Sequence, residues 1–300
     1  SFFTLGLNLM NWLVKKSSAY WRLARMDKPI GILLLLWPTL WALWLASAGK
    51  PDLKVLAVFV LGTVLMRAAG CVMNDMADRN FDGHVARTRH RPLATGEVSV
   101  KEALLLAMIL SLIAFALVMQ LNKLTMLLSF PALFLAASYP LTKRVIAIPQ
   151  AYLGVAFGFG IPMAYAAQTG SIPGIAWLLL LGNVFWAIAY DTEYAMVDRA
   201  DDLKIGIRSS AIFFGPRDVA AIMLSYGVLL GVLLLTGLHY GLDWPYYLGL
   251  IIAAMLAVYH YLLIRERQPA RCFKAFLHNN WLGAVVFFGL AASYALHFSS

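Results

Sequence analysis

Long apolar stretches follow one another along almost the whole chain, separated by short polar segments. Nine of them approach the length of about 20 residues that a helix needs to cross a membrane. They cover roughly residues 29–48, 53–74, 101–121, 124–141, 149–167, 173–191, 217–237, 245–263 and 280–297. This pattern predicts an all-α polytopic membrane protein with nine transmembrane helices, in which residues 29–298 form a single domain.

The first 28 residues follow a different pattern. Residues 1–14 are mostly apolar, and the basic pair Lys15 and Lys16 comes after them. A secretory signal peptide has the opposite order, with its positive charges first. We therefore expect residues 1–28 to be a cytoplasmic or interfacial segment, anchored at the membrane surface by Trp12.

The basic residues alternate between the two predicted membrane surfaces. Lys and Arg gather before the first span and after the second, fourth, sixth and eighth, whereas the other connections hold only Lys50, Lys54 and Lys123. The positive-inside rule then predicts a cytoplasmic N-terminus and a C-terminus on the opposite side, which would be the periplasmic side of a bacterial inner membrane. Most of the formal charge of +9 lies on the cytoplasmic face, where it suits an anionic leaflet or a diphosphate substrate equally well.

Composition and motifs exclude several classes of function. Hydrophobic residues make up 61% of the chain and charged residues 13%, which is typical of a membrane protein and leaves no soluble domain. Cys71 and Cys272 have no metal or redox spacing. Phosphate-binding glycine loops and a nucleophile elbow are absent from the sequence. We expect membrane lipid and small substrates as partners, with no nucleic acid and no protein partner.

Two acidic clusters stand where apolar stretches end, and they carry the main functional prediction. The first contains Asn74, Asp75, Asp78 and Asp82, and the second contains Asp191, Asp198 and Asp202. Carboxylates three, four or seven residues apart share one face of a helix. Both clusters are predicted to face the cytoplasm, so together they can hold Mg²⁺ on a phosphate-bearing substrate.

Arg67 lies inside the second apolar stretch. A charge at the centre of a membrane costs about 2.5–3.5 kcal/mol or more, and it indicates a functional site by default. One interpretation is a buried ion pair with Asp75 or another acid. The other is a guanidinium that binds the carboxylate of a small second substrate, with Asn74 seven residues further along the same face.

Several basic residues on the predicted cytoplasmic face can contact a diphosphate, although the topology rule also explains their presence. They are Arg79, Arg87, Arg91, Lys143, Arg144 and Lys204. Their positions alone do not decide between these two explanations.

At these residues the chain resembles the UbiA superfamily of intramembrane aromatic prenyltransferases. Residues 74–82 match the family's N-D-x-x-D-x-x-x-D motif, and residues 198–202 match its second D-x-x-x-D motif. The closer likeness is to the bacterial 4-hydroxybenzoate polyprenyltransferases of ubiquinone biosynthesis. It is carried by R-M-D-K-P-I-G at residues 25–31, R-A-A-G-C at 67–71, Y-P-L-T-K-R at 139–144, Y-D-T-E-Y-A-M-V-D at 190–198 and C-F-K-A-F at 272–276.

The resemblance implies a nine-helix bundle around a central cavity, capped by cytoplasmic loops. It further implies that Asp75, Asp78, Asp82, Asp198 and Asp202 hold Mg²⁺ on a polyprenyl diphosphate. The allylic cation is then attacked by the ring carbon ortho to the hydroxyl of 4-hydroxybenzoate, with Asp75, Asp78, Asp191 and Asp198 as catalytic residues and Asp191 as a candidate base. Another aromatic acceptor, and a secondary transporter of an anionic metabolite, are the alternatives. The acids lie at one membrane surface, whereas transporter sites normally lie near the midplane.

Overall fold

The computed structural model describes residues 2–299, and its regular elements are all helical. The α-helices are α1 (Phe2–Leu23), α2 (Ile30–Ala46), α3 (Leu53–Asp78), α4 (Val100–Val118), α5 (Lys123–Thr142), α6 (Pro149–Gly158), α7 (Gly160–Thr169), α8 (Gly174–Ile205), α9 (Ser210–Phe214), α10 (Asp218–Tyr240), α11 (Trp244–Ile264) and α12 (Pro269–Ser299). Two short 3₁₀ turns, η1 (Asp82–His84) and η2 (Gly215–Arg217), lie in the connections.

The all-helical prediction is confirmed, and each apolar stretch coincides with one helix or a pair of helices. Within the described residues, seven helical segments are long and apolar enough to cross a membrane. The first stretch forms α2, which has only 17 residues, and the fifth is divided between α6 and α7. The helices fit a multi-pass membrane protein, while the count of nine membrane crossings stays a prediction.

The interruption between α6 and α7 has a local cause. Proline has no amide hydrogen, so Pro162 cannot donate to the carbonyl of Gly158, four residues earlier. The helix is interrupted at Phe159 accordingly. α2 and α5, by contrast, continue through Pro38 and through Pro131 and Pro140.

The two helices that carry the acidic clusters extend beyond their apolar stretches. α3 begins at Asp52, whose side chain accepts bonds from two backbone amides, and it ends only at Asp78. α8 runs for 32 residues until Gly206, whose φ of 74° is a left-handed conformation that glycine adopts readily. Both acidic clusters therefore lie largely on continuous helix.

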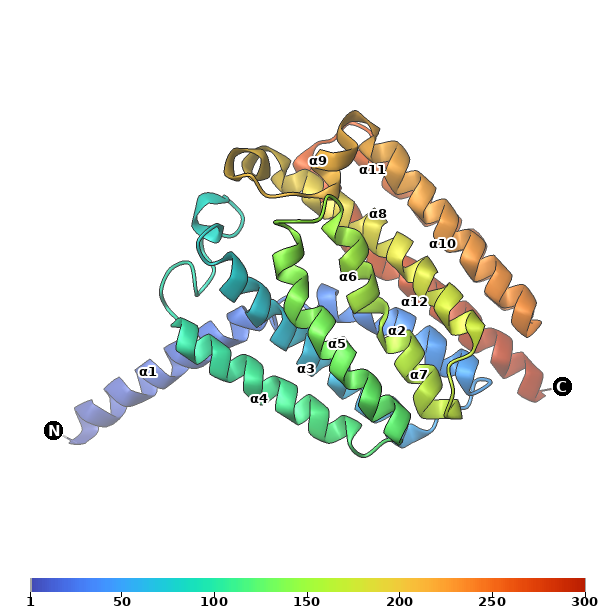
Figure 1. Cartoon of the computed structure of the whole chain (residues 1–300), viewed down its shortest axis with the longest axis horizontal. Coiled ribbons are helices and arrows are strands. Elements are labelled where there is room, and N and C mark those ends of the chain that lie inside the picture. The colour runs from blue at the N-terminus through green and yellow to red at the C-terminus, as the bar shows by residue number, and fades with distance from the viewer. Residues whose placement is uncertain (1, 300) are drawn as a thin grey trace.

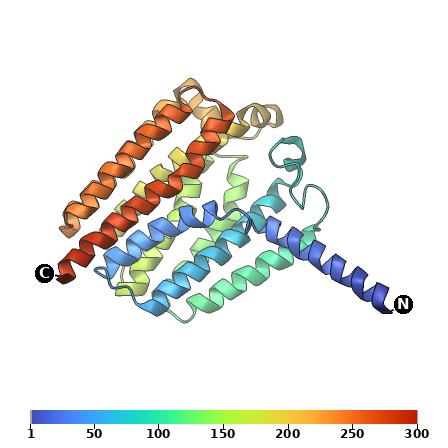
Figure 2. The same cartoon turned by 180° about the vertical axis from the view of Figure 1, so that it is seen from behind.

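The bundle is arranged around α2 and α8 (Figures 1 and 2). α11 and α12 run antiparallel beside each other, and α3, α4 and α5 lie on the other side of the bundle. Trp41 of α2 stacks on Trp186 of α8 with ring centroids 5.4 Å apart. These two tryptophans are almost fully buried and lie at the centre of the largest hydrophobic core.

α1 projects away from the bundle (Figure 1). Its outer part exposes large apolar side chains, among them Leu9, Trp12 and Leu13. Its inner end is held by ion pairs from Lys16 to Glu102 at 2.8 Å and from Arg22 to Glu97 at 2.5 Å. An interfacial role for residues 1–28 stays a prediction, and the exposed apolar face supports it.

Candidate active site

A cavity of about 1310 Å³ lies inside the bundle. Its lining comes from the segment after α1 and from α2 through α8, with a contribution from α12. One part is polar and contains most of the predicted site residues. The remainder is apolar, with Leu112 and Phe115 of α4 and Phe130 of α5 among its lining side chains. The cavity expected at the centre of the bundle is therefore present.

The two acidic clusters face this one cavity from different elements. Asn74, Asp78 and Asp82 line it from α3 and η1, and Asp191, Asp198 and Asp202 line it from α8. The two clusters are more than 100 positions apart in the sequence. The two clusters come together because α3 and α8 both continue as helix beyond their apolar stretches, at the same end of the bundle.

In each cluster, some carboxylates are paired with cations that also line the cavity. Lys143 Nζ donates to Asp78 Oδ2 at 2.9 Å and to Asn74 Oδ1 at 3.0 Å. Arg87 donates to Asp198 through Nη2 at 2.6 Å and through Nε at 3.0 Å, and its guanidinium lies 4.4 Å from the ring centroid of Tyr194. The planar guanidinium of arginine suits such two-point pairing.

Arg91 links the first cluster to the loop that follows it. Its Nη1 lies 3.0 Å from Asp82 Oδ2 and 3.0 Å from Asp75 Oδ1. Burial raises the pKa of the Asp82 carboxyl, against the opposing effect of Arg91. Together with Arg87, this arginine holds the 79–99 loop over the polar part of the cavity.

Asp75 differs from the other acids of its cluster. It is fully buried and is not among the cavity-lining residues. Arg25 donates to its Oδ1 at 2.8 Å, and Arg91 approaches the same oxygen. Its assignment as a metal ligand stays a prediction, and its contacts are those of a residue that fixes two arginines.

The donor set of the cavity fits a hard divalent cation. Among residues 2–299, no three His, Cys, Asp or Glu side chains converge closely enough to hold a metal by themselves, and Asp78, Asp82 and Asp198 are each paired with a basic side chain. The available donors are carboxylate and amide oxygens on two walls of one cavity. Mg²⁺ is usually bound in this way, by a few carboxylates together with substrate phosphates.

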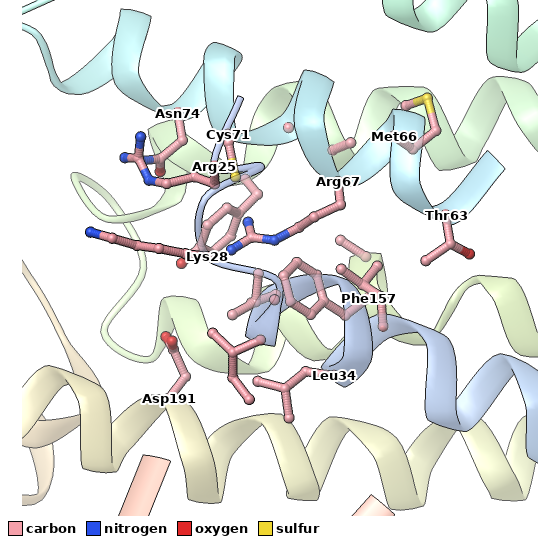
Figure 3. Close-up of a pocket in the computed structure, with 18 of the residues that line it drawn as sticks. Arg25, Lys28, Leu34, Thr63, Met66, Arg67, Cys71, Asn74, Phe157 and Asp191 are labelled. Carbon is pink, nitrogen blue, oxygen red and sulfur yellow. The ribbon is translucent and has the colours of Figure 1, made fainter. Parts of the chain in front are cut away.

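Arg67 enters the cavity from α3, while Asp191 enters from α8 on the opposite wall (Figure 3). The ion pair between Arg67 and Asp75 is wrong as an interpretation, because Asp75 is bound to Arg25 and Arg91. Among the residues that the structure describes, Arg67 Nε is a buried donor without a hydrogen-bond partner. The guanidinium lies 5.8 Å from the ring centroid of Phe157, and Nε remains available to a ligand.

Gly31 of α2 makes room for that guanidinium. A Cβ atom placed on Gly31 would lie 2.1 Å from Arg67 Nε and 2.2 Å from Nη2, far inside ordinary contact distances of about 3.5–4.0 Å. The absence of a side chain at Gly31 therefore allows Arg67 to lie directly against the backbone of α2.

Three of the predicted diphosphate ligands do not line the cavity. Arg79 is exposed and donates to the carbonyl of Met76. Arg144 donates to the carbonyl of Ala77. The Lys204 side chain is 76% exposed. Their roles as diphosphate ligands stay predictions, because none of the three residues lines the cavity.

Other basic residues line the cavity, although we did not assign them to the site from the sequence. They are Arg22, Arg25, Lys28 and Arg208. Arg25 and Lys28 belong to a short polar stretch just before an apolar span, and this position is the signal that could have pointed to them. Figure 3 shows both side chains among those that line the pocket, together with Asn74 and Arg67.

Comparison with known proteins identifies the family. The model of the UbiA prenyltransferase family matches residues 35–290. The chain belongs to this family. A 4-hydroxybenzoate octaprenyltransferase of Methylobacillus flagellatus is 69% identical over 281 residues, which cover 94% of this chain and 95% of that protein. Another, from Azoarcus sp., is 66% identical over 277 residues, which cover 92% of this chain and 96% of that protein.

Solved structures of UbiA homologues share the fold. The apo structure of a homologue from Aeropyrum pernix K1 has a TM-score of 0.77 at 26% identity, and the match covers 87% of this chain and 97% of that one. A homologue from Archaeoglobus fulgidus bound to GPP and Mg²⁺ has a TM-score of 0.67 at 19% identity, with 94% and 100% covered. The predicted resemblance to UbiA proteins is thus confirmed, and because this is a family of transferases, it outweighs the transporter alternative.

Proposed function

We propose that this UbiA protein transfers a polyprenyl group from polyprenyl diphosphate to 4-hydroxybenzoate, giving 3-polyprenyl-4-hydroxybenzoate for ubiquinone biosynthesis. The observation that carries the proposal is the meeting of two acidic helix ends with Arg67 in one cavity. The relatives that are 66–69% identical over more than nine-tenths of the chain bear the name of this activity.

The polar part of the cavity is suited to the diphosphate. We assign Asp78, Asp82, Asp198 and Asp202 to Mg²⁺, which, when bound, neutralises the departing diphosphate and lowers the barrier to its departure. Arg87, Arg91 and Lys143 form ion pairs with three of these carboxylates, those of Asp198, Asp82 and Asp78. They are close enough to this region to turn toward phosphate oxygens and to supply positive charge where negative charge develops.

Arg67 and Asp191 lie on opposite walls of the cavity, and we assign each of them to a different group of the aromatic acid. The Arg67 guanidinium binds the carboxylate and Asn74 contacts the same substrate, while Asp191 is placed to accept the phenol proton. The allylic C–O bond breaks and its electrons leave with the diphosphate. The ring carbon ortho to the hydroxyl then forms the new C–C bond and loses its hydrogen as a proton.

The apolar part of the cavity supports a lipid-like donor. Side chains from α4 and α5 line it, and they can accommodate isoprene units while keeping water from the reactive carbon. We further propose that residues 29–298 form one domain in the bacterial inner membrane. Its N-terminus and active site face the cytoplasm, in agreement with the distribution of Lys and Arg.

The test uses purified protein in detergent with ring-labelled 4-hydroxybenzoate, a series of prenyl diphosphates, and either Mg²⁺ or excess EDTA. A lipid-soluble labelled product that forms only with Mg²⁺ supports the proposal. Folded protein that gives no product with any chain length would reject this acceptor. A product formed instead from a naphthoate would then identify a UbiA enzyme with another acceptor.

A further inference from the structure

A buried polar cluster outside the cavity joins α8 to α10, α11 and α12. Glu193 of α8 is fully buried, and its two oxygens contact Tyr226 Oη at 2.7 Å and Asn279 Nδ2 at 2.9 Å. Tyr226 Oη also lies 2.8 Å from His260 Nδ1, and His260 Nε2 lies 3.0 Å from His278 Nδ1. A buried glutamate in an apolar helix needs an explanation, and neither of its partners carries a positive charge.

The orientation of the Asn279 amide can be deduced from its neighbours. Trp186 Nε1 lies 2.9 Å from Asn279 Oδ1, and an indole nitrogen can only donate. That contact fixes Oδ1 as the carbonyl oxygen. Nδ2 then donates to Glu193 and to the carbonyl of Ala275 at 3.0 Å.

Tyr226 then determines where the protons lie. Its hydroxyl makes three contacts, because Asn279 Oδ1 is also 3.0 Å away, and a phenol has only one hydrogen to donate. Asn279 Oδ1 can only accept, so the Tyr226 hydrogen must point to it. Glu193 and His260 must each donate to Tyr226 Oη, and His278 donates to His260 Nε2. Every contact in the cluster then contains one hydrogen, and this arrangement is possible only if Glu193 is protonated.

An ionised Glu193 would fit this arrangement poorly. The Tyr226 hydrogen would be drawn to the carboxylate, leaving Tyr226 Oη and Asn279 Oδ1 as two acceptors facing each other at 3.0 Å. A buried charge would also lack a counter-charge among its hydrogen-bonding partners. The protonated form removes both difficulties, since the whole cluster is then neutral and satisfied.

The cluster lies on the side of α8 that faces away from the cavity. Successive residues of an α-helix are about 100° apart, so Glu193 is on nearly the opposite face from Asp191. Asp191, Tyr194 and Asp198 line the cavity, whereas Glu193 does not. The bonds of Glu193 reach α10 through Tyr226 and α12 through Asn279, and they fix the rotation of α8 about its own axis.

We propose that Glu193 is a protonated positioning residue, which orients the catalytic face of α8 by donating a hydrogen bond to Tyr226. The role in orientation rests on the proposed function of the cavity. The protonation of Glu193 is independent of that function and can be measured without substrate.

The first arm of the test is infrared difference spectroscopy of purified parent protein against Glu193→Gln at neutral pH. We expect the parent to show the C=O stretch of a protonated carboxyl group that the variant lacks. If the difference spectrum contains only the bands of a carboxylate, Glu193 is ionised and the proposal is overturned.

The second arm compares Glu193→Gln with Glu193→Leu in prenyl transfer and in thermal unfolding. A glutamine can donate from its amide to Tyr226 and accept from Asn279, so we expect activity within about twofold of the parent. Leucine can do neither, and we expect its kcat/KM to fall about tenfold or more, since a misplacement of 1 Å can cost about 10²-fold. Ser225→Ala is the matched control, because within residues 2–299 the buried Ser225 hydroxyl bonds only inside α10, to the carbonyl of Ala221.

Equal losses in the Gln and Leu variants would show that the carboxylate itself is required and would refute a proton-donating role. If Glu193→Leu is too unstable to purify, Tyr226→Phe is tested instead. It removes the hydroxyl that contacts Glu193, His260 and Asn279, and we expect a similar fall in kcat/KM. Activity unchanged in Tyr226→Phe would also refute the orienting role. Should the parent not prenylate 4-hydroxybenzoate at all, the infrared result still decides the state of Glu193.

Discussion

Replacing Gly31 by alanine is expected to displace the Arg67 side chain without removing it. The new Cβ would lie 2.1 Å from Arg67 Nε and 2.5 Å from Cζ, at least about 1 Å inside an ordinary contact of about 3.5 Å. The atoms in the way belong to the end of a flexible side chain, so the guanidinium can move and the protein still folds. Alanine also favours a helix over glycine by about 0.5–1 kcal/mol, and we expect no loss of thermal stability.

The catalytic consequence follows from the bond that Arg67 would make to the substrate carboxylate. Hydrogen bonds to charged groups contribute about 1.5–3 kcal/mol, and each 1.4 kcal/mol corresponds to about a tenfold change in affinity. A displaced guanidinium loses much of this contribution. We expect Gly31→Ala to raise the KM for 4-hydroxybenzoate about tenfold or more, while the KM for prenyl diphosphate changes less than about twofold.

The assay is steady-state prenyl transfer, in which each substrate is varied at saturating concentrations of the other. Gly227→Ala is the matched control, because a Cβ at Gly227 in α10 would meet no atom within 4 Å. An unchanged KM for the aromatic acid in Gly31→Ala would refute the reasoning that Arg67 must lie against α2. A rise confined to the KM for prenyl diphosphate would refute the assignment of Arg67 to the aromatic acid.

The other predictions concern the acids and Arg67 itself. Arg67→Ala is expected to raise the KM for the aromatic acid at least as much as Gly31→Ala, and loss of prenyl diphosphate binding alone would show that the assignment is wrong. Asp78→Ala and Asp198→Ala should each abolish product formation while the protein still folds; Mg²⁺-dependent rates close to normal in both would contradict a site with metal ligands on two walls. Asp75→Ala should instead unfold at lower temperature, because removing one partner of a buried ion pair costs about 3–5 kcal/mol, and unchanged stability would contradict its role in fixing two arginines.

The apolar pattern predicted the helices well because each stretch must satisfy its backbone hydrogen bonds internally in lipid. It was less accurate at helix ends, since the polar continuations of α3 and α8 carry no apolar signal. It also could not separate α6 from α7, although Pro162 supplied a local reason for the interruption.

The acidic clusters could be predicted because regular spacing places their carboxylates on one helix face. The partners of these acids could not, since Lys143 and Arg87 reach Asp78 and Asp198 across more than 60 positions of sequence. Spacing likewise predicted for Asp75 the same role in metal binding as for its neighbours, whereas in the folded protein its carboxylate accepts a hydrogen bond from Arg25. A single sequence contains little information on which side of a helix the rest of the bundle covers.

The most direct test of the central claim is the fate of the ring hydrogens of 4-hydroxybenzoate. The measurement uses substrate labelled with tritium at both carbons ortho to the hydroxyl, with purified protein, prenyl diphosphate and Mg²⁺. We expect half of the tritium in each converted molecule to be released to water and the lipid-soluble product to carry the prenyl group on that carbon. A product that keeps all its tritium would mean attachment to an oxygen or to another ring carbon and would contradict prenylation ortho to the hydroxyl in this cavity.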